Sequence, residues 1–264
     1  MSSKCIVITG STRGIGLGLA REFLQRGHRL VLNGRKAEVL DGVLKEFRDE
    51  GFRDEGFRVE GVAGDVCEPG VFGALIEKAV KVFGGIDIWI NNAGIPQSNR
   101  YFHELDPAEI DRLIRVNLIS VLQGSREVLR FYCEQGYGLL LNLEGLGSDG
   151  RMVDKIAVYG TTKRAVQYFS KALAREVKEP GIRVGIISPG MVRTDFLKES
   201  SSVSDPEERR RNQKVFSILA EDVEVVTPIL ADKILRSRRH YPRIEYLTFR
   251  RLFPKVVRLT FVKK

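Results

Sequence analysis

Tyr159 and Lys163 have residue types and a spacing that suggest acid chemistry. They stand four residues apart in the sequence Y-G-T-T-K, at the start of a segment with helical periodicity, so their side chains would share one face of a helix. An unperturbed tyrosine has a pKa of about 10, and a nearby lysine cation would lower it enough for the phenol to act as an acid near neutral pH. Because such a pair also arises by chance on protein surfaces, it needs support from the rest of the chain.

A glycine-rich segment at residues 9–16 has the sequence T-G-S-T-R-G-I-G and stands between the first apolar run and the first amphipathic segment. Glycines allow backbone N–H groups to approach a diphosphate at the positive end of a helix. The same residues could also form an ordinary tight turn. Their position directly after a predicted first strand favours a dinucleotide site.

The second predicted strand ends in the sequence N-G-R-K at residues 33–36. An NAD-binding fold has an acid here, which holds the ribose 2′-hydroxyl. This chain has no acid at that place, and Arg13, Arg35 and Lys36 could reach a 2′-phosphate. The alternative is that these cations are solvated surface residues. We expect NADP(H) as the cofactor.

Short apolar runs alternate with longer amphipathic segments along the chain. We predict strands at residues 5–9, 29–33, 58–63, 86–91, 138–143 and 183–188, and helices at 15–26, 37–47, 71–83, 107–135 and 159–178. This alternation predicts an α/β fold with a doubly wound parallel sheet, in a single Rossmann-type domain over residues 1–235. In such a sheet, ligands bind beyond the carboxyl ends of the strands.

Three segments interrupt or extend this pattern. Residues 47–61 repeat the five-residue sequence F-R-D-E-G, F-R-D-E-G, F-R-V-E-G; recurring glycine prevents a continuous helix, so we expect a tolerated duplication in a surface connection. The polar residues 195–212 suggest a mobile excursion of the kind that forms lids, with a substrate loop near residues 195–214. Helical periodicity returns at 215–235, and 243–248 could be a last strand.

The composition fits one large domain with a sizeable core, since 43% of the 264 residues are hydrophobic. There is no apolar run of about 18 residues, and the chain start lacks a signal pattern, so we expect a cytosol-like location. The three cysteines, Cys5, Cys67 and Cys133, have no zinc or disulfide spacing and are expected in the core. The three histidines have no metal-ligand spacing either, and we expect no metal.

Residues 236–264 form a basic C-terminal extension with ten Lys or Arg residues and one acid, which gives them the whole net charge of +9. The rest of the chain is neutral, which argues against a nucleic-acid partner. Aromatic residues are interleaved with these cations. The extension could therefore lie on an anionic membrane surface, or it could pack on the domain or on a neighbouring subunit of a homo-oligomer.

Six segments with chemical character follow one another in a definite order. They are the glycine-rich residues 9–16, Gly64-Asp65-Val66, Asn91-Asn92-Ala93-Gly94, Asn117, the pair Tyr159 and Lys163, and S-P-G-M-V-R-T at residues 188–194. This succession resembles the short-chain dehydrogenase/reductase family over about residues 4–196. The resemblance implies an oxidoreductase that transfers hydride between a nicotinamide cofactor and a small-molecule carbonyl or alcohol.

The resemblance also implies roles for individual residues. Tyr159 would donate a proton to a carbonyl, Lys163 would bind the nicotinamide ribose and lower the pKa of Tyr159, and Asn117 would hold a proton-relay water. Asp65 would contact adenine, and Asn91 to Gly94 would support the cofactor pocket. The full set of expected cofactor-binding residues is Gly10, Ser11, Thr12, Arg13, Gly14, Ile15, Gly16, Arg35, Asp65, Val66, Asn92, Ala93, Gly94, Tyr159, Lys163, Pro189, Gly190, Val192 and Thr194.

The chain departs from the family pattern after the fifth predicted strand of the fold. The family has a serine there that hydrogen-bonds the substrate oxygen, and this serine aligns with Gly145. The nearest hydroxyl is that of Ser148, which either reaches back on a glycine-flexible loop as a catalytic residue or leaves the protein impaired. Loss of one oxyanion donor costs about 10²- to 10³-fold in rate.

The departing sequence N-L-E-G-L-G-S-D-G-R, together with Y-G-T-T-K-R and S-P-G-M-V-R-T-D, resembles the chlorophyll(ide) b reductase branch of the family. That resemblance implies NADPH-dependent reduction of the 7-formyl group of chlorophyll(ide) b to a hydroxymethyl group. Reduction of another bulky apolar aldehyde or ketone is an alternative. A non-catalytic NADP-binding sensor is a third, which the intact Tyr159, Lys163 and Asn117 argue against.

Overall fold

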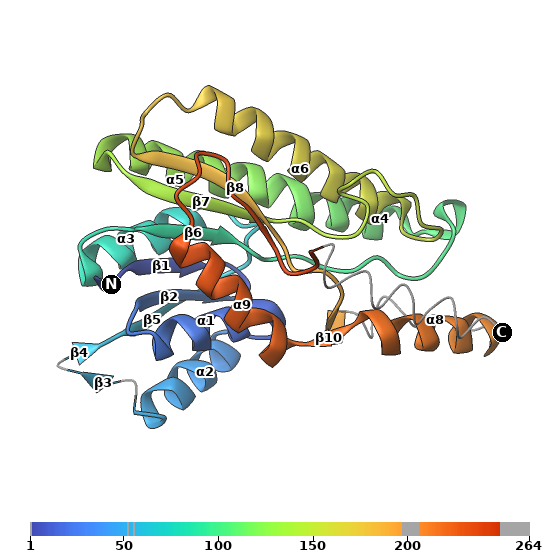
Figure 1. Cartoon of the computed structure of the whole chain (residues 1–264), viewed down its shortest axis with the longest axis horizontal. Coiled ribbons are helices and arrows are strands. Elements are labelled where there is room, and N and C mark those ends of the chain that lie inside the picture. The colour runs from blue at the N-terminus through green and yellow to red at the C-terminus, as the bar shows by residue number, and fades with distance from the viewer. Residues whose placement is uncertain (1, 52, 55, 197–205, 249–264) are drawn as a thin grey trace.

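The computed structural model describes residues 2–51, 53–54, 56–196 and 206–248. Its centre is a parallel sheet of seven strands in the order β11-β8-β7-β6-β1-β2-β5 (Figure 1). The strands are β1 (Cys5–Ile8), β2 (Arg29–Gly34), β5 (Val59–Ala63), β6 (Ile88–Asn91), β7 (Gly138–Leu143), β8 (Ile182–Ser188) and β11 (Arg243–Glu245). The chain adds strands on one side of β1 and then on the other, so the predicted doubly wound parallel sheet is confirmed.

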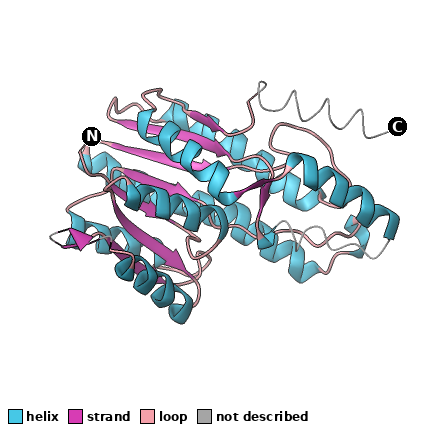
Figure 2. Ribbon diagram, turned by 60° about the horizontal axis from the view of Figure 1, so that its bottom comes forward, coloured by secondary structure: helices cyan, strands magenta, loops and turns pink. Residues whose placement is uncertain are grey.

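Helices cover both faces of the sheet (Figure 2). On one face lie α1 (Gly14–Gln25), α2 (Ala37–Asp49) and α9 (Val223–Arg236); on the other lie α3 (Val71–Phe83), α5 (Ser120–Gln135) and α6 (Ala157–Glu176). Strand β1 shows why the sequence folds this way. Ile6 and Ile8 enter one core and Cys5 and Val7 the other, so a wholly apolar run is buried on both sides, as parallel strands require.

The predicted helix at residues 107–135 contains a change of winding. It consists of α4 (Pro107–Ile114), a π-helical turn η2 (Arg115–Ile119) and α5. Asp106 starts it, because its Oδ1 accepts a hydrogen bond of 2.8 Å from the N–H of Ala108 and Pro107 follows at the first helical position. The π turn contains Asn117, and such turns are frequent at functional sites.

The C-terminal third differs from the sequence-based expectation in two ways. Helix α8 (Pro206–Leu219) occupies part of the expected polar loop, and residues 197–205 of that loop lie outside the described part. The expected helix at 215–235 is divided between α8 and α9 by β10 (Glu221–Asp222), which pairs with β9 (Val192–Arg193). Helix α8 lies beyond the carboxyl ends of the sheet strands (Figure 1).

The sheet continues into the segment that we assigned to the basic extension. Strand β11 pairs with β8, and Tyr246 and Ile244 are buried in the core. The boundary at residue 235 is therefore too early for the folded domain. Residues 249–264, which carry most of the tail's expected surface chemistry, lie outside the described residues.

The five-residue repeat runs from the last turn of α2 into β5. Strands β3 (Arg53–Asp54) and β4 (Gly56–Phe57) pair antiparallel within it. Of the three cysteines only Cys5 is buried; Cys67 is partly exposed and Cys133 exposed, which corrects the expectation that all three are core residues. No helix within the described ranges is long and apolar enough to span a bilayer.

Candidate active site

The glycine-rich turn after β1 is packed tightly against the segment after β6. Gly10 has φ +61°, and a Cβ there would stand 2.8 Å from Ala93 Cα, so glycine is required. The side-chain amide of Asn92 donates hydrogen bonds of 2.9 Å to the carbonyls of Thr9 and Gly10. A Cβ at Gly16 would meet Asn92 Nδ2 at 2.5 Å. The two expected cofactor segments are thus held together by contacts that exclude larger side chains.

The same turn has the shape needed for a diphosphate. Helix α1 starts at Gly14, and within the described part of the chain its N-cap residue, Arg13, makes no side-chain capping hydrogen bond. Backbone N–H groups of the first helical turn lack partners inside the helix and favour an anion. Across from this turn lies Thr194, whose Cγ2 would be 3.3 Å from a Cβ at Gly14. The residues present therefore fit the diphosphate of a dinucleotide.

Asn33 fixes the end of β2 beside this turn. Its Oδ1 accepts a hydrogen bond from the N–H of Gly10 at 3.2 Å, and its Nδ2 donates to the carbonyls of Val62 and Gly64. A Cβ at Gly34 would meet Thr12 Cγ2 at 2.4 Å. Arg13 follows Thr12 in the sequence and Arg35 follows Gly34, and both arginines are exposed. The two cations therefore lie near the place where the ribose 2′-position is expected.

Asp65 and Val66 follow β5 at the same edge of the sheet. Asp65 Oδ1 accepts a hydrogen bond of 2.9 Å from the N–H of Cys67, and Val66 is buried. In the segment after β8, Gly190 has φ +75°, and a Cβ there would stand 2.7 Å from Leu247 Cδ1, while Val192 is buried. The segments that carry these expected cofactor residues thus follow β5 and β8 at the carboxyl ends of parallel strands.

Tyr159 and Lys163 are buried on α6, on the face that packs against β7. Tyr159 is 8% exposed and Lys163 3%, and Lys163 Nζ lies 5.8 Å from the centroid of the Tyr159 ring. The ammonium donates a hydrogen bond of 3.2 Å to the Leu143 carbonyl. A Cβ at Gly94 would lie 3.7 Å from Lys163 Nζ and 3.3 Å from Asn117 Oδ1. The structure therefore brings together three of the four expected catalytic side chains.

Asn117 is fully buried, and both ends of its amide are engaged. Its Oδ1 accepts from the N–H of Ile95 at 2.8 Å, and its Nδ2 donates to the Ile95 carbonyl at 2.9 Å. The side chain thus fixes the segment after β6 against η2. Its expected role in holding a relay water stays a prediction.

The missing family serine has a steric explanation. A Cβ at Gly145 would stand 2.3 Å from the Tyr159 hydroxyl oxygen, and a Cβ at Gly147 would stand 2.8 Å from Gly160 Cα. The G-x-G sequence therefore allows the loop after β7 to lie directly on the first turn of α6. A serine at residue 145 would require the phenol to move.

Ser148 is buried in this loop but does not hydrogen-bond Tyr159 in the structure. Its N–H donates to the Gly145 carbonyl at 3.1 Å, and its carbonyl accepts from Arg164 Nη1 at 2.8 Å. Burial raises the pKa of Glu144, and the charge of Arg243 and hydrogen bonds from the hydroxyls of Ser188 and Ser148 oppose this rise. The catalytic role that we expected for Ser148 therefore remains a prediction.

Burial dominates the protonation of the catalytic pair. It raises the pKa of Tyr159, in contrast to the lowering that we expected from Lys163. Burial also lowers the pKa of Lys163 to about 8, and the negative charge of Glu144 opposes this. A phenol that keeps its proton at neutral pH is suited to donate it, and an ammonium beside it stabilises the phenolate that remains.

Two residues at the site were not identified from the sequence. The ring of Phe196 packs edge-on against Tyr159, with centroids 5.7 Å apart. The side chain of Gln97 accepts a hydrogen bond from the N–H of Tyr159 at 3.0 Å and donates to the Lys155 carbonyl at 2.9 Å. Gln97 lies in an irregular segment, and Phe196 lies in the stretch that the sequence predicted as a polar excursion, so no periodicity indicated the direction of either side chain.

The family model described as short chain dehydrogenase matches residues 4–205. The probable chlorophyll(ide) b reductase NYC1 of Arabidopsis thaliana is 33% identical over 96% of this chain and 52% of its own length, and the chlorophyll(ide) b reductase NOL of the same plant is 37% identical over 87% and 64%. A 3alpha-hydroxysteroid dehydrogenase of Mediterraneibacter gnavus is 30% identical over 75% and 77%. The chain thus spans about half to two thirds of the length of these plant relatives.

Among solved structures, the gluconate 5-dehydrogenase of Burkholderia cenocepacia in complex with NADP and tartrate has a TM-score of 0.76 at 28% identity, covering 93% of this chain and 94% of that one. The expected NADP(H) cofactor fits this neighbour and the geometry of the turn after β1. The matched segment contains the glycine turn and the buried Tyr159 and Lys163. The chain therefore belongs to the short-chain dehydrogenase family of oxidoreductases, which act on alcohol and carbonyl groups.

Proposed function

We propose that the protein reduces the 7-formyl group of chlorophyll(ide) b to a hydroxymethyl group, with NADPH as the reductant. The observation that carries the proposal is the contact between Gly145 and the Tyr159 hydroxyl. Because of this contact, the glycine that replaces the family serine belongs to the packing of the site around Tyr159 and Lys163. The plant relatives support the substrate, because they are chlorophyll(ide) b reductases.

The chain's own residues supply the proton. When bound, a reduced nicotinamide supplies a hydride to the formyl carbon. Tyr159 donates its phenolic proton to the formyl oxygen, which takes the electron pair of the C=O bond, and the product is a primary alcohol. Lys163 then stabilises the phenolate, because its ammonium lies beside the ring. Phe196 covers the ring from one side and limits the access of water to it.

The choice of NADPH over NADH rests on the end of β2. Arg13 and Arg35 are exposed next to the contact between Thr12 and Gly34. A 2′-phosphate can accept charge-assisted hydrogen bonds from both guanidinium groups. NAD-binding sites have an acid at the end of the second strand. Here the residue at that place is Asn33, whose side chain hydrogen-bonds the neighbouring backbone.

Another bulky apolar carbonyl compound is the second candidate substrate. The hydroxysteroid dehydrogenase relative, of whose length the chain covers 77%, favours it. Exposed apolar side chains follow β6 and β7, at Tyr101, Phe102, Leu146, Met152 and Val153, and would suit either class of substrate. A sensor without catalysis would not need the buried pair of Tyr159 and Lys163.

A competition assay separates these candidates. The purified chain, NADPH, chlorophyllide b and a 3-oxosteroid are incubated together, and products are identified by chromatography and mass. The proposal predicts 7-hydroxymethyl chlorophyllide as the main product. Reduction of the steroid alone would favour the second candidate, and binding of NADPH without any reduction would favour the sensor.

We also propose that residues 249–264 make a reversible contact with anionic lipid. Tyr241 packs against the core and Tyr246 is buried, so these two aromatics belong to the domain. The six Lys and Arg residues beyond Thr248 remain as candidates, each contributing about 1 kcal/mol near such a surface. The full chain should sediment with anionic vesicles at low salt, and a chain ending at Thr248 should not. The shorter chain keeps β11, so a loss of folding would not explain its release; sedimentation of both chains, or of neither, would contradict the proposal.

A further inference from the structure

Glu144 is the first residue after β7, between the two residues that contact the catalytic pair. The carbonyl of Leu143 accepts the hydrogen bond of Lys163, and Gly145 lies against the Tyr159 hydroxyl. Glu144 is only 2% exposed, although a carboxylate is costly to bury. Its backbone N–H donates to the Ile187 carbonyl of β8 at 2.9 Å, so its position in the sheet is fixed.

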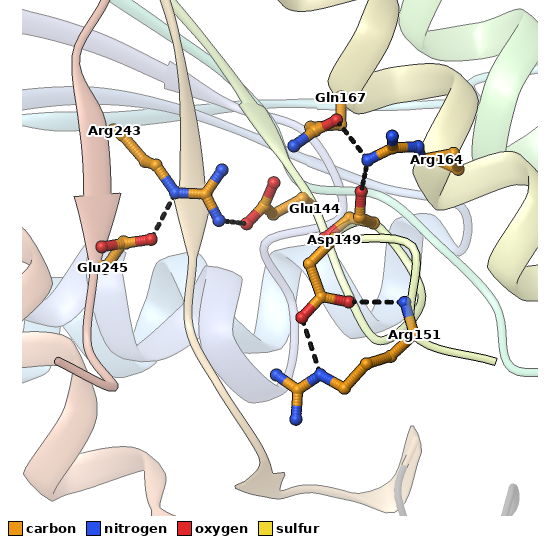
Figure 3. Close-up of polar contacts among 8 residues, drawn as sticks. Glu144, Asp149, Arg151, Arg164, Gln167, Arg243 and Glu245 are labelled. Carbon is orange, nitrogen blue, oxygen red and sulfur yellow. Dashed lines mark hydrogen bonds and ion pairs between the residues drawn. The ribbon is translucent and has the colours of Figure 1, made fainter. Parts of the chain in front are cut away.

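Arg243 of β11 provides the partner of this buried carboxylate. Its Nη2 lies 2.9 Å from Glu144 Oε1, and its Nε donates to Glu245 (Figure 3). Among the described residues, Glu144 Oε2 makes no hydrogen bond of normal geometry. Buried ion pairs contribute little net stability compared with apolar residues of similar volume. The Glu144 carboxylate, paired with Arg243 and within reach of the Ser188 and Ser148 hydroxyls, is therefore better explained by its place beside the catalytic pair than by stability.

The negative charge of Glu144 acts on the buried ammonium of Lys163. Its ammonium is buried, and its hydrogen-bond acceptor, the Leu143 carbonyl, is neutral. Burial lowers the pKa of Lys163, and the charge of Glu144 raises it. The other charged or titratable groups that act on Glu144 are Arg243 and Glu245, and Tyr241 interacts with Glu144 in turn. Tyr159 is the neighbour of Lys163 on α6.

We propose that Glu144 is a positioning residue: held by Arg243, its carboxylate keeps Lys163 charged beside Tyr159 and fixes the loop of Gly145 to Ser148 over the phenol. The effect of Glu144 on catalysis rests on the proposed function. The charge coupling between Glu144 and Lys163 does not, and it can be measured without any substrate.

The test is a pH titration of Lys163 by NMR. The 13Cε resonance of Lys163 is assigned in lysine-labelled protein by its loss in Lys163→Arg, and its midpoint is measured in the unsubstituted chain, Glu144→Gln and Glu245→Gln. Glu245→Gln is the matched control, because it removes the same charge from the same arginine. The midpoint should fall by about one pH unit in Glu144→Gln and stay in place in Glu245→Gln.

Equal midpoints in the unsubstituted chain and Glu144→Gln would overturn the inference, as would equal shifts in the two variants. If Glu144→Gln does not fold, the double variant Glu144→Gln with Arg243→Gln leaves no unpaired buried charge; its midpoint should fall in the same direction but by less, because the arginine cation is lost as well. The alkaline limb of the rate profile should move with the midpoint. A chain that reduces no carbonyl compound would refute the proposed function, while the NMR titration would still decide the role of Glu144.

Discussion

The candidate site has two regions that are built by different means, one after β1, β2 and β5 and the other after β7, β8 and β11. Near β1, β2 and β5, glycines and the neutral side chains of Asn33 and Asn92 fix the backbone, and the cations Arg13 and Arg35 are exposed. Near β7, β8 and β11, the charged side chains of Lys163 and Glu144 are themselves buried. The first region thus depends on shape, with its charges screened by solvent. The second region depends on a balance of buried charges, where the loss of one partner strongly destabilises the fold.

Removal of the Tyr159 hydroxyl should have the largest effect. Tyr159→Phe deletes the proton donor and should lower turnover about 10²- to 10⁴-fold. The affinity for NADPH should stay nearly unchanged, because the phenol acts on the substrate carbonyl. Stopped-flow reduction and fluorescence titration measure the two quantities. Tyr168→Phe on the exposed face of α6 is the control. Retained turnover in Tyr159→Phe would show that another group donates the proton.

Restoring the family serine at residue 145 should impair this chain. Because a Cβ there would stand 2.3 Å from the Tyr159 hydroxyl oxygen, Gly145→Ser should displace the phenol and lower kcat about 10²-fold. Gly73→Ser on α3 is the matched control, since a Cβ at that position meets nothing within 4 Å. A faster Gly145→Ser enzyme would mean that the loop yields and that the serine supplies the missing oxyanion contact.

Arg35→Ala tests the region that depends on shape and exposed charge. Loss of a charge-assisted hydrogen bond to the 2′-phosphate should weaken NADPH binding about tenfold to a hundredfold and leave NADH binding unchanged. Lys45→Ala on α2 removes an equally exposed cation as a control. Isothermal titration with both cofactors measures the difference, and equal weakening of both would place Arg35 outside the 2′-phosphate site.

The pH dependence of the rate should report Lys163. Since its pKa is lowered to about 8, kcat/KM should fall as pH rises above about 8, where the ammonium is lost. Stability should respond in the opposite direction: from about pH 8 to the ordinary lysine pKa of 10.5, the folded state binds fewer protons than the unfolded state, so this group makes unfolding harder as pH rises. Lys163→Met should remove this rise in denaturation midpoint. A rise that persists in Lys163→Met would assign it to another group.

The sequence predicted the parts of the site that local chemistry determines. The strands follow from apolar runs buried on both faces, and the glycine turn from its position between a strand and a helix. The pair of Glu144 and Arg243 could not be predicted, because 99 residues separate them and only the addition of β11 to the sheet joins them. The raised pKa of Tyr159 was missed for a related reason: burial by Phe196 and the loop after β7 arises from tertiary contacts.

The most direct test of the central claim follows the hydride itself. The chain is incubated with chlorophyllide b and NADPH carrying deuterium at both C4 positions, and the product is analysed by mass spectrometry and NMR. The account predicts 7-hydroxymethyl chlorophyllide with one deuterium on the hydroxymethyl carbon, formed by the unsubstituted chain and not by Tyr159→Phe. Unchanged chlorophyllide b, under conditions in which NADPH is bound, would contradict it.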